Sequence, residues 1–439
     1  MTRHPKHTRH AARPPAPQDA EGAAPEGTIV PADGPSFAQP VFTPDPTEFK
    51  VYHGSDSTAY KKIDAYNKTH KAASLPFPLP RGVDAQTPEP VLTLQQVLNN
   101  NKAAIKAIED TGQIVFHALG DSGSTRGPET QNEVADKLES DFDERDKADV
   151  PCFLFHLGDV VYSFGEAKYY FDQFYDAYRD YPGPILAIPG NHDGMVAPGS
   201  DVPTLDAFLR NFCQENFVFT PESGGLSRTA QIQPGVFYTF EAPFVRILAL
   251  YSGTLEDPGV IADKDIGNAQ LQFLEAALKR VKKEKYEGAL IIAHHHPAYT
   301  YGSHGWSKEL TAQIDEICTK TGIWPHAVFS GHAHNYQRFT RTHGKMQIPY
   351  LVNGNGGHPP LQRLARKYDP PLRTPVQLQG GKEGDSVIFE NYDDQDYGYL
   401  RVIANSKTLR IEYHPASDGP AAKTPDDVVT IDLQSRTIS

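Results

Sequence analysis

The sequence predicts an α/β fold in which strands end in loops that carry functional side chains. From residue 113 onwards, short apolar runs of strand length recur and end in polar motifs, most of which contain glycine. Stretches with the apolar spacing of helices separate several of these runs. Alternation of strand, loop and helix is typical of a sheet with functional loops at its strand ends.

The chain is expected to begin with a disordered segment. Residues 1–46 are rich in Pro, Ala, Gly and charged residues and hold almost no large apolar side chains. Such a composition cannot bury enough apolar surface to offset the entropy lost on folding. Residues 47–112 are interpreted as an N-terminal extension. Apolar spacing near 3.6 over residues 92–111, ending at Gly112, predicts a helix within it.

The main domain is predicted over residues 113–415, followed by a C-terminal tail over 416–439. Five strands are predicted to lead into polar motifs, in the segments IVFHALGDSG (114–123), CFLFHLGDVVY (152–162), ILAIPGNHD (185–193), ALIIAHHHP (289–297) and HAVFSGHAH (326–334). Helices are predicted at 130–148, 166–180, 203–215, 268–284 and 307–320. From about residue 336 the pattern becomes mostly β, interrupted by a long loop over 354–385.

Bulk composition argues against several functional classes. A net charge of −13 disfavours binding to nucleic acid or to an anionic membrane surface. The sequence contains no run of 18 apolar residues, so no membrane span is predicted. Cys152, Cys213 and Cys318 are too few and too far apart for a disulfide framework or a cysteine zinc site. The N-terminus lacks the apolar core of a signal peptide, so a cytoplasmic protein is the default expectation, with export left open.

Side chains that can bind metal ions follow each of the five predicted strands. In chain order they are Asp121, then Asp159 and Tyr162, then Asn191, His192 and Asp193, then His294, His295 and His296, and finally His332 and His334. We expect these groups to gather at one edge of one sheet. Burying them alone is costly, whereas a cation satisfies them together. Asp159 is central in sequence and could bridge two cations about 3.5–4 Å apart.

Five motifs in this order resemble the signature of the purple acid phosphatases, which belong to the calcineurin-like metallophosphoesterase superfamily. They are D-x-G (121–123), G-D-x-x-Y (158–162), G-N-H-D (190–193), I-x-x-H (292–295) and G-H-x-H (331–334). Each motif alone occurs by chance, but five in order at strand ends are specific. The resemblance covers about half of the chain and implies a four-layer α/β/β/α sandwich with metal ions at the sheet edge.

Two positions favour the purple acid phosphatases within that superfamily. In most calcineurin-like enzymes the first motif is D-x-H, and its histidine is a metal ligand. This chain has Gly123 at the position of that histidine. Tyr162 stands where purple acid phosphatases supply a tyrosine ligand instead. Because a phenol has a pKa of about 10, only a strongly Lewis-acidic ion holds it as phenolate. This indicates Fe(III) in the first site.

The resemblance also implies ligand sets and catalytic residues. The first ion resembles one held by Asp121, Asp159, Tyr162 and His334. The second resembles one held by Asp159, Asn191, His295 and His332, a set that suits Fe(II), Zn(II) or Mn(II). Two further histidines, His192 and His304, match positions that contact phosphate and help protonate the leaving group. We therefore expect a binuclear-metal hydrolase of acid phosphatase type, which cleaves small-molecule phosphate monoesters by attack of a metal-bound hydroxide.

Plainer interpretations exist for each of these residues. Asp121, Asp159 and Asn191 could cap helices or turns, and Tyr162 could be a core aromatic residue. Caps explain neither the histidines nor the order of the motifs. Two alternative functions stay open at this point: a phosphodiesterase that uses the same site, and a non-catalytic metal-binding module. The G-D-S-G run at 120–123 is typical of serine proteases, but the β/α alternation and the cysteines exclude that fold.

Overall fold

The computed structural model describes residues 77–439 except 85, 125, 163, 197–200, 254–258, 303, 365–371 and 379–383. The segment predicted to be disordered, residues 1–46, lies outside the described residues. Part of the predicted loop over 354–385 also lies outside them.

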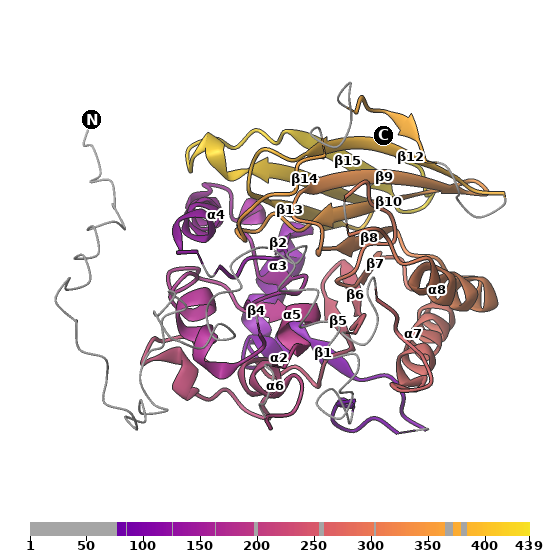
Figure 1. Cartoon of the computed structure of the whole chain (residues 1–439). Coiled ribbons are helices and arrows are strands. Elements are labelled where there is room, and N and C mark those ends of the chain that lie inside the picture. Colours follow the sequence, from indigo (N-terminus) through magenta and orange to yellow (C-terminus); the bar gives the residue numbers. More distant parts are fainter. Residues whose placement is uncertain are drawn as a thin grey trace. The chain divides into compact units, whose positions relative to one another are not determined.

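Two β-sheets form the centre of the described part of the chain (Figure 1). One sheet has nine strands, in the spatial order β1 (Val91–Thr93), β5 (Tyr238–Ala242), β6 (Val245–Ala249), β7 (Ala289–Ala293), β8 (Ala327–Ser330), β10 (Met346–Asn353), β9 (Tyr336–His343), β12 (Ser386–Asp393) and β11 (Val376–Gln377). The other has six, in the order β15 (Asp427–Asp432), β14 (Thr408–Pro415), β13 (Gly398–Asn405), β2 (Gln113–Leu119), β3 (Leu154–His156) and β4 (Ile185–Ala187).

A shared apolar core joins the two sheets face to face. Along β7, Ala289, Ile291 and Ala293 pack into this core, while Leu290 and Ile292 pack into a second core on the outer face. This alternation follows from the period of two in a strand, and a strand buried on both faces reads as a continuous apolar run. Phe153, just before β3, meets Phe240 of β5 edge to face at 5.0 Å between ring centroids. The core thus links both sheets directly.

Helices cover the outer faces of the sheets, which completes the four layers expected from the resemblance. The helices α7 (Ala269–Glu284) and α8 (Lys308–Thr321) lie side by side on the nine-stranded sheet (Figure 1). Ser307 caps α8 by accepting a hydrogen bond from the amide of Leu310, and Gly322 ends it in the left-handed conformation. The other helices are α2 (Leu94–Val97), α3 (Lys102–Thr111), α4 (Glu129–Ser140), α5 (Asn191–Gly194) and α6 (Asp206–Phe212).

Several predicted helices differ in length from those of the structure. The region 92–111 is not one helix, because Asn99 and Asn100 take left-handed φ values of 53° and 59° between α2 and α3. Asparagine tolerates that conformation better than most residues, so the apolar spacing did not reveal the break. The helix predicted over 166–180 is a 3₁₀ turn (Ala167–Tyr169) followed by a π-helical turn (Phe171–Tyr175). Further 3₁₀ turns are Asp141–Asp143, Lys147–Asp149, Pro221–Ser223 and Ala416–Asp418.

The expectation that all five motifs lie on one sheet is wrong. β2, β3 and β4 are parallel neighbours in the six-stranded sheet, whereas β7 and β8 are parallel neighbours in the nine-stranded sheet. An apolar run does not encode which sheet it joins, and here both sheets end at the same place. β1 from the predicted extension pairs with β5, and β15 from the predicted tail pairs with β14. Within the described residues, none of the helices has the length and apolar character needed to cross a bilayer.

Candidate metal centre

Sharp turns at the strand ends aim the polar side chains toward one another. Asp121, Asp159 and His332 take left-handed φ values of 57°, 54° and 68°. Such conformations are unfavourable for residues other than glycine and tend to cluster at functional sites. Close approach of the loops also explains one motif glycine. A Cβ on Gly190 would lie 2.1 Å from Asp159 Oδ1, so only glycine leaves room for this carboxylate beside the loop after β4.

One group of side chains contains three residues predicted as ligands of the first ion. The Tyr162 hydroxyl donates to Asp121 Oδ1 at 3.0 Å and lies 3.4 Å from His334 Nε2. His334 Nε2 is also 3.5 Å from Asp121 Oδ1. All three side chains are buried. They therefore present two oxygens and one nitrogen to the same small space.

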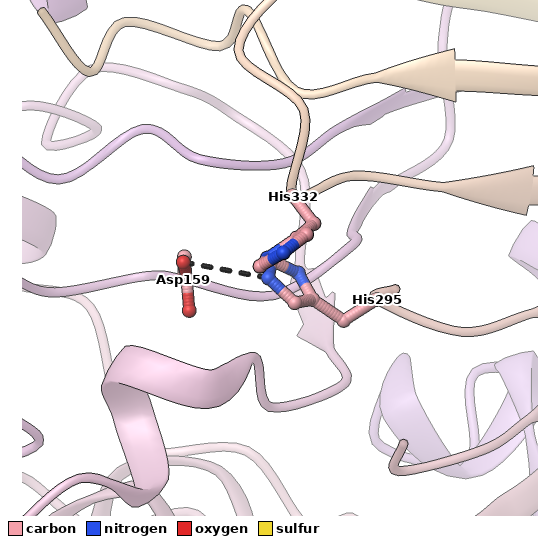
Figure 2. Close-up of side chains that lie close together, drawn as sticks. All are labelled: Asp159, His295 and His332. Carbon is pink, nitrogen blue, oxygen red and sulfur yellow. Dashed lines mark ion pairs between the residues drawn. The ribbon is translucent and has the colours of Figure 1, made fainter. Parts of the chain in front are cut away.

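A second group contains the residues predicted as ligands of the second ion. Asn191 Oδ1 lies 3.0 Å from His295 Nε2 and 2.9 Å from His332 Nδ1. Asp159, His295 and His332 each place a possible ligand atom within 4.8 Å of the other two. Figure 2 shows these three side chains converging, with an ion pair of 3.4 Å between Asp159 Oδ2 and His295 Nε2. Asp159 follows a strand of one sheet, and the two histidines follow strands of the other.

Both groups form one continuous cluster. The backbone amide of His332 donates to Asp121 Oδ2 at 2.7 Å, and the amide of His192 donates to Asp159 Oδ1 at 2.8 Å. The remaining oxygen, Asp159 Oδ2, is buried and accepts no hydrogen bond from any described residue. Its contact there is the 3.4 Å ion pair with His295 Nε2, and a metal cation nearby would also satisfy it. The mixed nitrogen and oxygen donors fit a pair of metal ions on both sides of Asp159.

A comparison with family models agrees with this geometry. Residues 114–336, half of the chain, match the model of the calcineurin-like phosphoesterases. The chain belongs to the calcineurin-like phosphoesterase family. The matched span begins in β2 and ends at the start of β9, so it includes all five motifs predicted from the sequence.

Individual relatives of this phosphoesterase are distant. Purple acid phosphatase 15 of Arabidopsis thaliana is 25% identical over 209 residues, which cover 45% of this chain and 35% of the relative. Purple acid phosphatase 18 of the same plant is 27% identical, covering 43% and 39%. Tartrate-resistant acid phosphatase type 5 of Rattus norvegicus is 24% identical, covering 38% and 45%. The chain thus spans less than half of the length of these relatives.

Among solved structures, the phosphoesterase overlaps with GAP50, the anchor in the inner membrane complex of Plasmodium. The TM-score is 0.48 at 14% identity, over 73% of this chain and 89% of GAP50. That score is too low to support any argument about function.

Charges in the phosphoesterase cluster are strongly coupled. Burial alone would lower the pKa of His295, but Asp159 and Asp121 raise it to about 9. Burial would raise the pKa of Asp159, but His295 and His192 lower it well below the usual value of a carboxyl group. Burial, Asp121 and Asp159 together raise the pKa of Tyr162 well above that of a free phenol. A metal ion that took His295 or Tyr162 as a ligand would therefore have to displace a proton from that side chain.

The two histidines predicted to be catalytic both lie beside the cluster. The ring centroid of His192 is 4.2 Å from that of Tyr162. His304 lies 4.6 Å from His332 and 5.8 Å from His334 between ring centroids. Burial, with help from His334 and His192, lowers the pKa of His304 to about 3.

Residues around the cluster hold its loops in place. Asp193 accepts hydrogen bonds from the amides of Val160 at 3.1 Å and Gly190 at 2.8 Å, which ties the loops after β3 and β4 together. Burial and the neighbouring Asp159 raise the pKa of Asp193 to about 7. His156 Nε2 lies 2.8 Å from Ser122 Oγ, as expected for a satisfied core histidine. These hydrogen bonds hold the motif loops of the phosphoesterase in position around the cluster.

Sequence reasoning missed one residue of the cluster, His358. Its ring stacks on Tyr162 at 3.6 Å between centroids and lies 4.9 Å from the ring of His334. A signal was present in the sequence, because His358 ends a glycine-rich run, N-G-N-G-G-H, that follows the apolar run of β10. That is the same plan as the five motifs of the phosphoesterase.

Proposed function

We propose that this phosphoesterase hydrolyses phosphate monoesters as a metal-dependent enzyme of acid phosphatase type. The observation that carries the proposal is the convergence of Asp121, Asn191 and His332 on one buried cluster from two different sheets. Core packing alone does not favour gathering carboxylates, an amide and imidazoles in this way, whereas a shared pair of cations does. The distant purple acid phosphatase relatives support the same reaction class.

The proposed ligands follow from the two groups of side chains. The first ion would be held by Asp121, Asp159, Tyr162 and His334, and the second by Asp159, Asn191, His295 and His332. The position of the Tyr162 hydroxyl beside Asp121 and His334 supports Fe(III) in the first site, because a strongly Lewis-acidic ion holds a tyrosine as phenolate. The second set of donors suits Fe(II), Zn(II) or Mn(II) equally well.

The roles of the protein side chains can be derived from their places. When bound, the two cations supply Lewis acidity that neutralises phosphoryl oxygens and lowers the pKa of water. Asp159 lies between the two ligand groups, so its carboxylate would serve both ions. His192 lies against Tyr162, where it hydrogen-bonds a phosphoryl oxygen and donates a proton toward the leaving group. His304 lies beside His332 and His334, where it can contact a phosphoryl oxygen of the bound substrate.

The decisive experiment compares a monoester with a diester. Purified protein loaded with iron and zinc, or iron and manganese, is assayed on p-nitrophenyl phosphate and on bis(p-nitrophenyl) phosphate. We expect a higher kcat/KM on the monoester. A much higher value on the diester would make the protein a phosphodiesterase. Protein that binds both ions and hydrolyses neither ester would be a non-catalytic metal-binding module.

A matched pair of variants connects the activity to this site. His192→Ala should lower kcat by about 10²–10⁴-fold, because it removes a proton donor while all proposed metal ligands remain. His326→Ala serves as the control. His326 is a buried histidine at the start of β8, the end of the strand away from His332. Equal losses in both variants would show that His192 has no special role.

A further inference from the structure

Position 123, where most members of the family carry a metal-binding histidine, has no room for a side chain. A Cβ on Gly123 would lie 2.5 Å from the carbonyl oxygen of Val160 and 2.5 Å from Gln173 Oε1. The side chain of Gln173 is fixed there because its Oε1 accepts from the amide of Tyr162 at 2.8 Å and its Nε2 donates to the carbonyl of Tyr162 at 2.7 Å. The space beside Gly123 is therefore used to hold Tyr162.

An imidazole reaches the same place from another part of the chain. The segment after β10 is hydrogen-bonded along the first motif. The amide of Gly356 donates to the carbonyl of Gly120 at 3.0 Å, and the amide of His358 donates to the carbonyl of Asp121 at 2.9 Å. At the other end, the amide of Gly120 donates to the carbonyl of Asn353 at 2.9 Å. These bonds place His358 in register with Asp121 and Gly123.

The hydrogen bonds of His358 define which nitrogen is available. Its Nδ1 lies 2.6 Å from the carbonyl oxygen of Gly123, so Nδ1 carries the proton and donates it to that oxygen. Its Nε2 is buried and has no hydrogen-bond partner among the described residues. The side chain as a whole is 3% exposed. A buried nitrogen lone pair without a donor nearby needs a partner that this part of the chain does not supply.

His295 shows the same arrangement within the cluster. Its Nδ1 lies 2.9 Å from the carbonyl oxygen of Leu157, and its Nε2 faces Asn191 Oδ1. Donation of one ring N–H to a backbone carbonyl is the usual way in which proteins orient a metal-binding imidazole. His358 combines this feature with close ring contacts to Tyr162 and His334, two of the proposed ligands of the first ion.

We propose that His358 Nε2 is an additional nitrogen donor to the first metal ion, in place of the imidazole that position 123 cannot carry. The proposal rests on the binuclear site of the proposed function. It adds a second imidazole, besides His334, to the ligands of that ion. Gly123 has two roles in this arrangement. It stands where the first motif would otherwise carry a histidine, and its carbonyl oxygen orients His358.

Two variants test the proposal through metal affinity. His358→Asn keeps an amide N–H that can donate to Gly123 O but removes the Nε2 nitrogen, and His358→Ala removes both. Competition with a chelator measures the dissociation constant of the first ion, and elemental analysis measures ions per chain. We expect both variants to raise that dissociation constant at least about tenfold. The control His326→Ala should leave it unchanged. Thermal melting identifies any variant that is not folded.

The optical spectrum and pulsed EPR separate the possible outcomes. In the His358 variants, the phenolate–iron absorption band could shift while the dissociation constant of the first ion stays unchanged. This result would mean that His358 only positions Tyr162, and it would overturn the proposal. Pulsed EPR of wild-type protein with Fe(III) and Zn(II) needs no variant, and it should detect two imidazole nitrogens bound to iron. Detection of one would also overturn it. Wild-type protein that binds fewer than two ions would instead contradict the proposed function itself.

Discussion

Tyr162 has an environment that opposes its ionisation in the metal-free protein. It is buried, its hydroxyl donates to Asp121 at 3.0 Å, and both Asp121 and Asp159 raise its pKa. The same two carboxylates would attract a cation of high charge into this space. In the proposed site, binding of Tyr162 as phenolate would favour a ferric ion over a divalent one.

Replacing Tyr162 with Phe should remove the colour of the iron-loaded protein. The expected absorption band arises from charge transfer between the phenolate and Fe(III), so concentrated wild-type protein should be purple or pink. The absorption spectrum measured at equal iron content checks this. Tyr170→Phe is the control, since the buried Tyr170 hydroxyl has no hydrogen-bond partner among the described residues. A band that persists in Tyr162→Phe would remove tyrosine from the ligand set.

At the scale of secondary-structure elements, buried ion pairs fix the position of α8 and the outer strands. Arg341 of β9 is fully buried. Its guanidinium donates to Asp315 of α8 at 2.7 and 2.6 Å and to Asp385, just before β12, at 2.8 Å. Such a buried charge is satisfied only while all three elements stay together. The arrangement specifies how α8 packs on the nine-stranded sheet.

Replacing Arg341 with Met should lower the free energy of unfolding by about 3–5 kcal/mol, because Asp315 and Asp385 lose their buried ion pairs with Arg341. Urea denaturation measures the change. Arg179→Met is the control. Arg179 pairs with Asp176 at 3.0 Å, but its side chain is 43% exposed, so the loss there should stay below about 1 kcal/mol. Similar losses in the two variants would contradict a special role for the buried cluster.

In the six-stranded sheet, the paired strands β13 and β14 surround a carboxylate whose pKa is lower in the folded protein than in the unfolded chain. Glu412 of β14 lies 3.2 Å from Arg401 of β13 and 2.7 Å from Arg410. Burial would raise the pKa of Glu412, but His414, Arg410 and Arg401 lower it to about 2 from an ordinary value of 4.5. A carboxyl group with a lower pKa in the folded state stabilises the fold above its unfolded pKa. That stabilisation disappears as the pH falls through the folded pKa.

The free energy of unfolding should therefore decrease as the pH falls from about 4.5 toward 2. Glu412→Gln should be less stable than wild type above this window, by up to about 3 kcal/mol, and should match it at the acidic end. Urea titrations at several pH values measure the two curves. Parallel curves for the variant and the wild type would show that Glu412 does not contribute to the pH dependence.

At the scale of the whole molecule, the cluster lies where two sheets end together. Asp121, Asp159 and Asn191 follow β2, β3 and β4 of the six-stranded sheet, whereas His295, His332 and His334 follow β7 and β8 of the nine-stranded sheet. Ions bound between them would join the two sheets in addition to the apolar core. Because the unfolded chain lacks this arrangement, bound metal favours the folded state.

Removal of metal should lower the melting temperature by several degrees, since ligand binding at 1,000 times Kd stabilises a protein by about 4 kcal/mol. Differential scanning calorimetry with and without a chelator measures the shift, and added metal should reverse it. In Asp159→Ala, which lacks the shared carboxylate, the chelator should have much less effect. Elemental analysis should confirm that the chelator removes the ions. If the melting temperature then stays constant, bound metal does not hold the two sheets together.

The sequence alone determined the strand ends and the side chains placed there. Short apolar runs and motifs such as G-N-H-D are local, so they could be recognised without knowing what they pack against. Helices with clear caps, such as α8 between Ser307 and Gly322, were predicted nearly to the residue. The assignment of metal ligands among these side chains came from the resemblance and stays a prediction until metal is measured.

Only the tertiary structure decided which strands share a sheet and which distant residue completes the cluster. The motifs divide between two sheets, because the pairing of an apolar strand depends on long-range burial and not on its own pattern. The contact between His358 and Gly123 joins residues 235 positions apart. It depends on the hydrogen bonds that hold the segment after β10 along the first motif. Local spacing contains no information about such a contact, since it forms only when both sheets are in place.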